Sequence, residues 1–272
     1  MKKNPIGFTA QSEKKGESIE HALPCQEVPC PKKSVVHVYF PHRDMGWSYY
    51  NDKFDLKVGD LVYVEGKLEG YRGKVTQVSY SFKIKSSDYK KVVAVIDTSV
   101  KGDLFAAGSH FISFDKNVIP FQKTRSWFFS PIEYEEYIDI SDDTASFPLE
   151  DLSFMKILRK EADRGLDHYM EKNVTCLELD NTHGRAIVDG TVPYEIEFEY
   201  SEGIISNIRC SCFEAGSCRH EYAVMLQLRE TLDAIADNFE EKYDGYFAAI
   251  SRDVFFGLVM GRKDIGKITL GV

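Results

Sequence analysis

Two periodicities divide the chain. Between Val35 and Ile96, short runs of β-branched and aromatic residues alternate with glycine and polar clusters, and apolar positions do not recur at helical spacing. The runs cover residues 35–40, 61–64, 74–78 and 92–96. Closely spaced short strands with tight turns are typical of a small closed barrel, so the pattern predicts a β-barrel domain over residues 34–130.

The second half mixes helical and strand patterns. Apolar residues between Phe154 and Tyr169 recur near helical spacing and predict a helix that opens the second domain. Strands are expected over 174–179, 185–188, 194–200 and 204–209. The run 194–200 alternates apolar residues with glutamates, and the turn at 201–203 returns it as an antiparallel hairpin ending at Cys210. From His220 to Ile250, apolar residues at helical spacing predict two helices broken near Asp244-Gly245.

Composition completes the domain plan. Residues 1–33 contain few large apolar side chains and are expected to form a flexible arm. Residues 131–152 are acidic and are expected to form a linker. The chain is therefore predicted to be a two-domain α+β protein, with the barrel over 34–130 and the second domain over 153–272.

Charge separates the same two halves. The 272 residues carry a formal net charge of -9, but residues 1–130 hold 20 Lys/Arg against 14 Asp/Glu (+6), and residues 131–272 hold 14 against 29 (-15). The front half is suited to face an anion. Neither a membrane span nor an apolar signal core is apparent, so the expected location is the cytoplasm, at the nucleoid or, in a eukaryotic host, in the nucleus.

The distinctive chemistry lies in residues 209–220, where a Cys-x-Cys pair is followed by Cys-x-His. The candidate zinc ligands are Cys210, Cys212, Cys218 and His220. Residues i and i+2 of an extended segment point to one face, so the first pair presents both sulfurs together, and Gly216 lets the loop return to the second pair. Four ligands complete the tetrahedron of a structural Zn²⁺ site and leave no position for a catalytic water. The alternative is that these cysteines are buried apolar residues or stray thiols.

Other sulfur and imidazole groups do not complete a second site. Cys176 lies within an expected strand and is interpreted as a core residue. His21, Cys25 and Cys30 lie in the arm and lack a fourth ligand, so an unstructured arm with unpaired thiols is the favoured interpretation.

The stretch 174–228 resembles the SWIM zinc finger. The likeness rests on 184–198, on the pair Cys210 and Cys212, and on Cys218-x-His220 followed by Glu-Tyr-Ala. The resemblance implies a CxC…CxH ligand set after a strand hairpin, and a role in DNA binding or protein interaction beside helicase-like ATPases. Acidic side chains surround this finger, which argues against direct phosphate contact by it.

The segment 56–75 resembles the KOW-type or primosomal-helicase amino-terminal pattern of SH3-like or OB-like barrels, and both settings involve nucleic acid. Basic residues crowd the same hairpin region, interleaved with aromatic residues that offer faces for base stacking. The candidate nucleic-acid contacts are Arg72, Lys74, Lys83, Lys85, Lys90 and Lys91. The alternative is a solvated basic hairpin whose aromatic side chains pack inward.

No catalytic motif is apparent. Residues 261–267 satisfy GxxxxGK, but Ile268 stands where a phosphate-binding loop needs Ser or Thr for Mg²⁺, which favours a turn. The sequence thus predicts a non-catalytic zinc protein that associates with DNA or another nucleic acid. The alternative is an interaction adaptor for a helicase-like ATPase, without nucleic-acid contact of its own. A metal-dependent enzyme would need an open coordination position.

Overall fold

A computed structural model describes residues 32–131 apart from 84, 86 and 87, residues 146–259 apart from 213 and 215, and residues 268–271. Three regions named above lie outside this part of the chain. They are the arm with His21, Cys25 and Cys30, most of the acidic linker (132–145), and the GxxxxGK segment (261–267).

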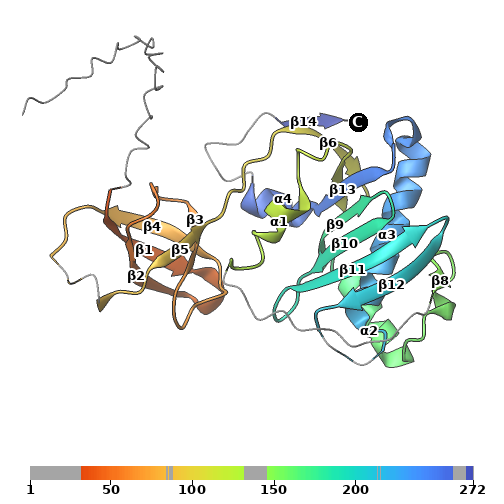
Figure 1. Ribbon diagram of the computed structural model, residues 1–272, viewed down its shortest axis with the longest axis horizontal. Coiled ribbons are helices and arrows are strands. Elements are labelled where there is room, and N and C mark those ends of the chain that lie inside the picture. The colour runs from red at the N-terminus through yellow and green to blue at the C-terminus, as the bar shows by residue number, and fades with distance from the viewer. Residues whose placement is uncertain are drawn as a thin grey trace, which may run out of the picture.

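The amino-terminal half begins with a five-stranded antiparallel sheet in the order β2-β1-β4-β3-β5, called here the small sheet (Figure 1). Its strands are β1 (Ser34–Phe40), β2 (Met45–Asn51), β3 (Leu61–Val64), β4 (Gly73–Ser79) and β5 (Val92–Val95). The two edge strands meet, because the Tyr50 backbone N–H donates to the Lys90 carbonyl at 2.9 Å and Tyr50 bridges Lys91. Alternate residues of β1, including Val36 and Val38, are fully buried in the core of this sheet.

Four of these strands are confirmed, and β2 was missed. β2 has the sequence MGWSYYN, in which glycine and polar residues break the apolar alternation. Its position is set by pairing with β1. Gly46 lies under the imidazole of His37, since a Cβ there would come 2.5 Å from His37 Nε2. Pairing with a neighbour, rather than local composition, therefore defines this strand.

The second sheet has nine strands in the order β14-β6-β7-β13-β9-β10-β11-β12-β8, called here the large sheet. Its strands are β6 (Gly102–Ala107), β7 (His110–Ser113), β8 (Phe147–Pro148), β9 (Val174–Asp180), β10 (His183–Val188), β11 (Tyr194–Ser201), β12 (Ile204–Cys210), β13 (Tyr246–Ser251) and β14 (Ile268–Gly271). All neighbours pair antiparallel except β14 and β6. The four strands expected between 174 and 209 are all present.

Residues 102–130 join the large sheet instead of closing the small one. β6 and β7 pair with each other, and β7 pairs with β13 from the far end of the chain. The short helix α1 (Phe121–Arg125) also lies on the large sheet, where Phe121 is part of the core. The small sheet therefore spans residues 34–95, a shorter stretch than the 34–130 expected.

Helices cover both faces of the large sheet (Figure 1). α3 (Arg219–Asn238) packs on one face, and α1 and α4 (Arg252–Leu258) pack on the other. α2 (Arg159–Met170) packs against α3. The described residues also include the short 3₁₀ turns η1 (Pro41–Arg43), η3 (Leu152–Phe154) and η4 (Glu240–Lys242). Two largely antiparallel sheets with α-helices confirm the α+β class.

The helix expected after Asp244-Gly245 is wrong, because Tyr246–Ser251 forms the central strand β13. All six residues of β13 are buried. Phe247 and Ala249 face the core that contains α3, while Ala248 and Ile250 face the core that contains α4. A strand covered on both faces loses the apolar-polar alternation, and its continuous apolar run then cannot be distinguished from a buried helix by period.

Candidate metal centre and basic surface

The β11–β12 hairpin and the start of α3 bring the four predicted ligands together. Cys210 is the last residue of β12 and lies opposite Ile196 of β11. The Ser211 N–H donates to the Glu195 carbonyl at 2.9 Å, which extends the hairpin toward Cys212. Cys218 and His220 stand at the N-cap and in the first turn of α3.

The ligand atoms lie at distances suited to one tetrahedral ion. All four lie within 4.8 Å of one another. His220 Nδ1 lies 3.7 Å from Cys210 Sγ and 3.8 Å from Cys218 Sγ. Zinc bonds of about 2.3 Å to sulfur and about 2.0–2.1 Å to nitrogen, at the tetrahedral angle, place sulfur and nitrogen about 3.6 Å apart. These residues therefore fit Zn²⁺, which would be held by three thiolates and Nδ1 of the imidazole.

Burial supports a structural role for this cluster. Cys218 and His220 are each 1% exposed, and Cys210 and Cys212 are half-buried. Four protein ligands fill a tetrahedral coordination sphere, which leaves no position for a substrate. A metal held here would join the end of a hairpin to the start of a long helix, and its binding energy would stabilise the fold.

The three sulfurs lie close enough to shift one another's pKa. Cys212 accepts from Cys210 and from Cys218, and these bonds lower the pKa of its thiol. Cys210 donates to Cys212, which raises the pKa of the Cys210 thiol. Cysteine binds metal as the thiolate, so a metal ion at this cluster would release the thiol protons.

The start of α3 adds a capping box around Cys218. The Cys218 Sγ accepts from the Glu221 N–H at 3.5 Å, and a Glu221 carboxylate oxygen accepts from the Cys218 N–H at 3.1 Å. This capping box fixes the start of α3 and holds the Cys218 sulfur at the helix N-terminus, beside the other ligands.

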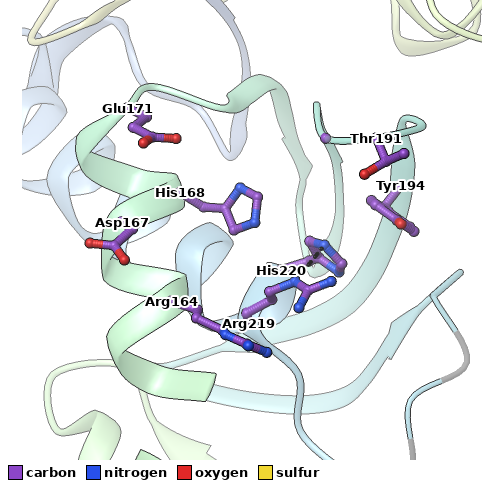
Figure 2. A pocket seen from close by; sticks show the side chains of 9 residues that line it. Arg164, Asp167, His168, Glu171, Thr191, Tyr194, Arg219 and His220 are labelled. Carbon is purple, nitrogen blue, oxygen red and sulfur yellow. Dashed lines mark hydrogen bonds between the residues drawn. The ribbon is translucent and has the colours of Figure 1, made fainter. Parts of the chain in front are cut away.

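His220 also lines a pocket of about 280 Å³, which is shown from close by in Figure 2. Tyr194 stacks on the His220 ring with centroids 4.0 Å apart, and the His168 ring lies 5.3 Å away. Arg219 lines the pocket and forms long ion pairs of 3.7 and 3.8 Å with Glu161 and Glu214. Sequence reasoning missed Tyr194 and His168 as neighbours of the ligand set. The apolar-polar alternation predicted the strand β11, but it did not indicate that the ring of Tyr194, its first residue, stacks on His220.

Cys176 lies outside the cluster, as the sequence indicated. It is 2% exposed on β9, within the core that contains α1 and α4. Burial raises the pKa of its thiol to about 12. It is therefore an apolar core residue and not a fifth ligand.

The structure divides the six candidate nucleic-acid residues into two groups. Arg72 is largely buried at the junction of the two sheets, where its guanidinium donates to the Trp127 carbonyl at 2.5 Å and lies over the Phe128 ring. Burial lowers the pKa of Arg72. Lys91 forms an ion pair of 3.1 Å with Asp52.

The other four lysines are exposed, and in the described part of the chain none forms an ion pair. They are Lys74, Lys83, Lys85 and Lys90. Lys74 stands on β4, and the remaining three lie on the connection from β4 to β5. These four side chains, called here the free lysines, are the part of the predicted set that is available to an anionic polymer.

Among the described residues, no helix has both the length and the apolar character needed to span a bilayer. Comparisons with protein-family models, with curated proteins and with solved structures found no match to this chain. The resemblance to the SWIM zinc finger therefore rests on the ligand spacing and its hairpin-to-helix setting.

Proposed function

We propose that this chain is a non-catalytic zinc-binding protein that associates with DNA through its small sheet. In this proposal the finger of the SWIM type is a structural and partner-docking module. The observation that carries it is the convergence of Cys210, Cys212, Cys218 and His220 within 4.8 Å of one another, between a hairpin and the start of a helix.

The free lysines support the nucleic-acid part of the proposal. They lie on β4 of the small sheet and on its connection to β5, within the half of the chain that carries the positive net charge. Lysine contacts to phosphates release condensed counterions, so binding through them weakens steeply as salt increases. The large sheet, with its acidic surroundings, is less suited to face phosphate.

Binding of the zinc-loaded full chain to single-stranded and double-stranded oligonucleotides, across a salt series, tests this part. Changing all four free lysines to Gln is expected to weaken binding at low salt by at least tenfold and to flatten the salt slope. The matched control changes four exposed lysines outside the small sheet, which form no ion pair among the described residues, to Gln: Lys101, Lys156, Lys160 and Lys242. Equal losses in both variants would contradict binding by the small sheet.

An adaptor without nucleic-acid contact is the second candidate, and the net charge of -15 on residues 131–272 favours it. In this case the acidic half docks on a basic subunit, such as a helicase-like ATPase. No oligonucleotide binding at low salt, together with zinc bound at one ion per chain, would favour the adaptor. Absence of zinc from the purified chain would contradict both candidates.

A further inference from the structure

An apolar row lies exposed along α2 instead of facing the core. Leu158, Ala162, Leu166 and Met170 follow at intervals of four residues and form one ridge of the helix. Leu158, the N-cap residue of α2, is 76% exposed, Leu166 46% and Met170 68%, while Ala162 is half-buried. These four residues are called here the α2 row. Phe154, which is 65% exposed, precedes it by the same interval.

The contact of α2 with the rest of the protein is made by a different ridge. Gly165 is buried, and a Cβ there would lie 2.7 Å from the Arg219 carbonyl oxygen and 2.9 Å from Tyr222 Cβ. Tyr169 donates its hydroxyl to Glu230 of α3 at 2.8 Å. α2 thus packs on α3 through a small residue and a polar contact, and its larger apolar residues remain uncovered in the described part of the chain.

An acidic ridge runs beside the α2 row. The residues that follow the members of the row by one position are Arg159, Asp163, Asp167 and Glu171, all exposed, so this ridge carries one basic residue at its start and three acidic residues after it. Neither Asp163 nor Asp167 forms an ion pair among the described residues. Arg164 turns its guanidinium to Glu161 at 2.8 Å and does not neutralise this ridge.

The row is connected to the metal centre. Ile157, directly before Leu158, forms a β-bridge with Ser217, directly before the ligand Cys218. Arg219, directly after Cys218, lies 3.7 Å from Glu161 of α2. The loop that holds the ligands therefore also fixes the start of α2.

We infer that the α2 row binds an amphipathic helix of a protein partner, in which an apolar stripe is flanked by lysines or arginines. This inference rests on the proposed partner-docking role of the finger and specifies its surface. Apolar side chains of the partner cover the row, and basic side chains pair with Asp163 and Asp167. A second copy of this chain is a poorer occupant, because pairing two α2 helices would bring two acidic ridges together.

A displayed library of 18-residue amphipathic peptides tests the inference on the zinc-loaded full chain. The peptides share one leucine stripe, and the flanking positions vary among Lys, Glu, Gln and Ser. Lysine is expected to be enriched at the flanks. The selected peptide, labelled with a fluorophore, is expected to lose at least tenfold in affinity for Leu166→Ser/Met170→Ser. The control Val58→Ser changes an exposed apolar residue on the connection from β2 to β3 and is expected to bind as the parent does.

A second variant isolates the charges. Asp163→Asn/Asp167→Asn is expected to retain binding but to lose the preference for lysine over glutamate flanks. No enrichment, acidic or neutral flanks, or unchanged binding by the leucine-methionine variant would overturn the inference. Two further results would overturn the inference. Dimers of the parent chain that are lost only in the leucine-methionine variant would identify a second copy as the partner of the α2 row. Higher peptide affinity after removal of residues 1–31 would identify that segment as its partner. Oligonucleotide binding and zinc content of the same variants stay at parental values, so failure here is separable from failure of the proposed function.

Discussion

The small sheet and the large sheet differ in whether their candidate functional groups are exposed or buried. On the small sheet the candidate functional groups are exposed lysines, which are held by no partner in the described part of the chain. On the large sheet the titratable groups of interest are buried and have defined neighbours, as at His220 and His110. A buried polar or charged group needs a hydrogen-bond or ion-pair partner at the right distance, whereas an exposed charge is stabilised by water without one. Changes in the large sheet should therefore alter folding stability, and changes in the small sheet should alter binding.

The largest effect is expected from removing a metal ligand. Cys218→Ser should lose bound zinc and reduce the free energy of unfolding by about 4 kcal/mol, which lowers the melting temperature by ~10 °C, because metal binding at a structural site stabilises the fold. Zinc content by mass spectrometry and thermal unfolding measure both quantities. Cys176→Ser is the control: it should destabilise the core but retain one zinc per chain. Full zinc content in Cys218→Ser would refute the metal centre.

His110 provides a test by pH within the large sheet. It is fully buried on β7, and its Nε2 lies 2.7 Å from the Val174 carbonyl oxygen. Its Nδ1 lies 2.9 Å from Ser109 Oγ. Burial lowers its pKa to about 4, although the Val174 carbonyl and Glu230 oppose that shift and Arg252 and Lys172 add to it.

The unfolded histidine has a pKa of about 6.5, so the unfolded state binds the proton first as pH decreases. The contribution to stability is therefore complete above pH 6.5 and decreases between pH 6.5 and 4, by about 3 kcal/mol in total. Denaturant unfolding at several pH values measures this loss. His110→Gln should remove most of this slope. If the free energy of unfolding of that variant depends on pH as it does in the parent, the pH dependence comes from other groups.

A smaller effect is expected where α2 meets α3. Gly165→Ala should destabilise the protein by about 1–3 kcal/mol, because the new methyl group would press on the Arg219 carbonyl and Tyr222. Gly257 in α4 has open space around its Cβ position, so Gly257→Ala is the matched control. It should stabilise by up to about 1 kcal/mol through helix propensity. Stabilisation of both variants would show that α2 and α3 are less closely packed.

The sequence predicted the parts of the fold that carry a clear period or a strict ligand spacing. The four ligands and the hairpin before them could be found, because metal chemistry limits both residue type and spacing. β13 could not, since burial on both faces erases its alternation. The helical spacing of Leu158, Ala162 and Leu166 predicted a helix here, and α2 confirms it. Which side of that helix faces solvent depends on Gly165, whose packing against α3 no local pattern reveals.

The smallest effects separate Arg72 from Lys74, two basic residues two positions apart in the candidate set. Arg72 donates to the Trp127 carbonyl across the junction of the sheets, so Arg72→Gln should reduce the free energy of unfolding by about 1–2 kcal/mol. It should leave the salt slope of oligonucleotide binding unchanged. Lys74 is exposed, and Lys74→Gln should change stability by less than ~0.5 kcal/mol while reducing that slope by about one.

Denaturant unfolding and a salt titration of both variants form a two-by-two comparison. The expectation is contradicted if Arg72→Gln reduces the salt dependence of oligonucleotide binding and leaves the free energy of unfolding unchanged. It would mean that the arginine leaves its place at the junction to contact phosphate, and that the DNA surface extends between the sheets. If the effects divide as expected, burial alone decides which of two neighbouring cations contributes to folding and which to binding.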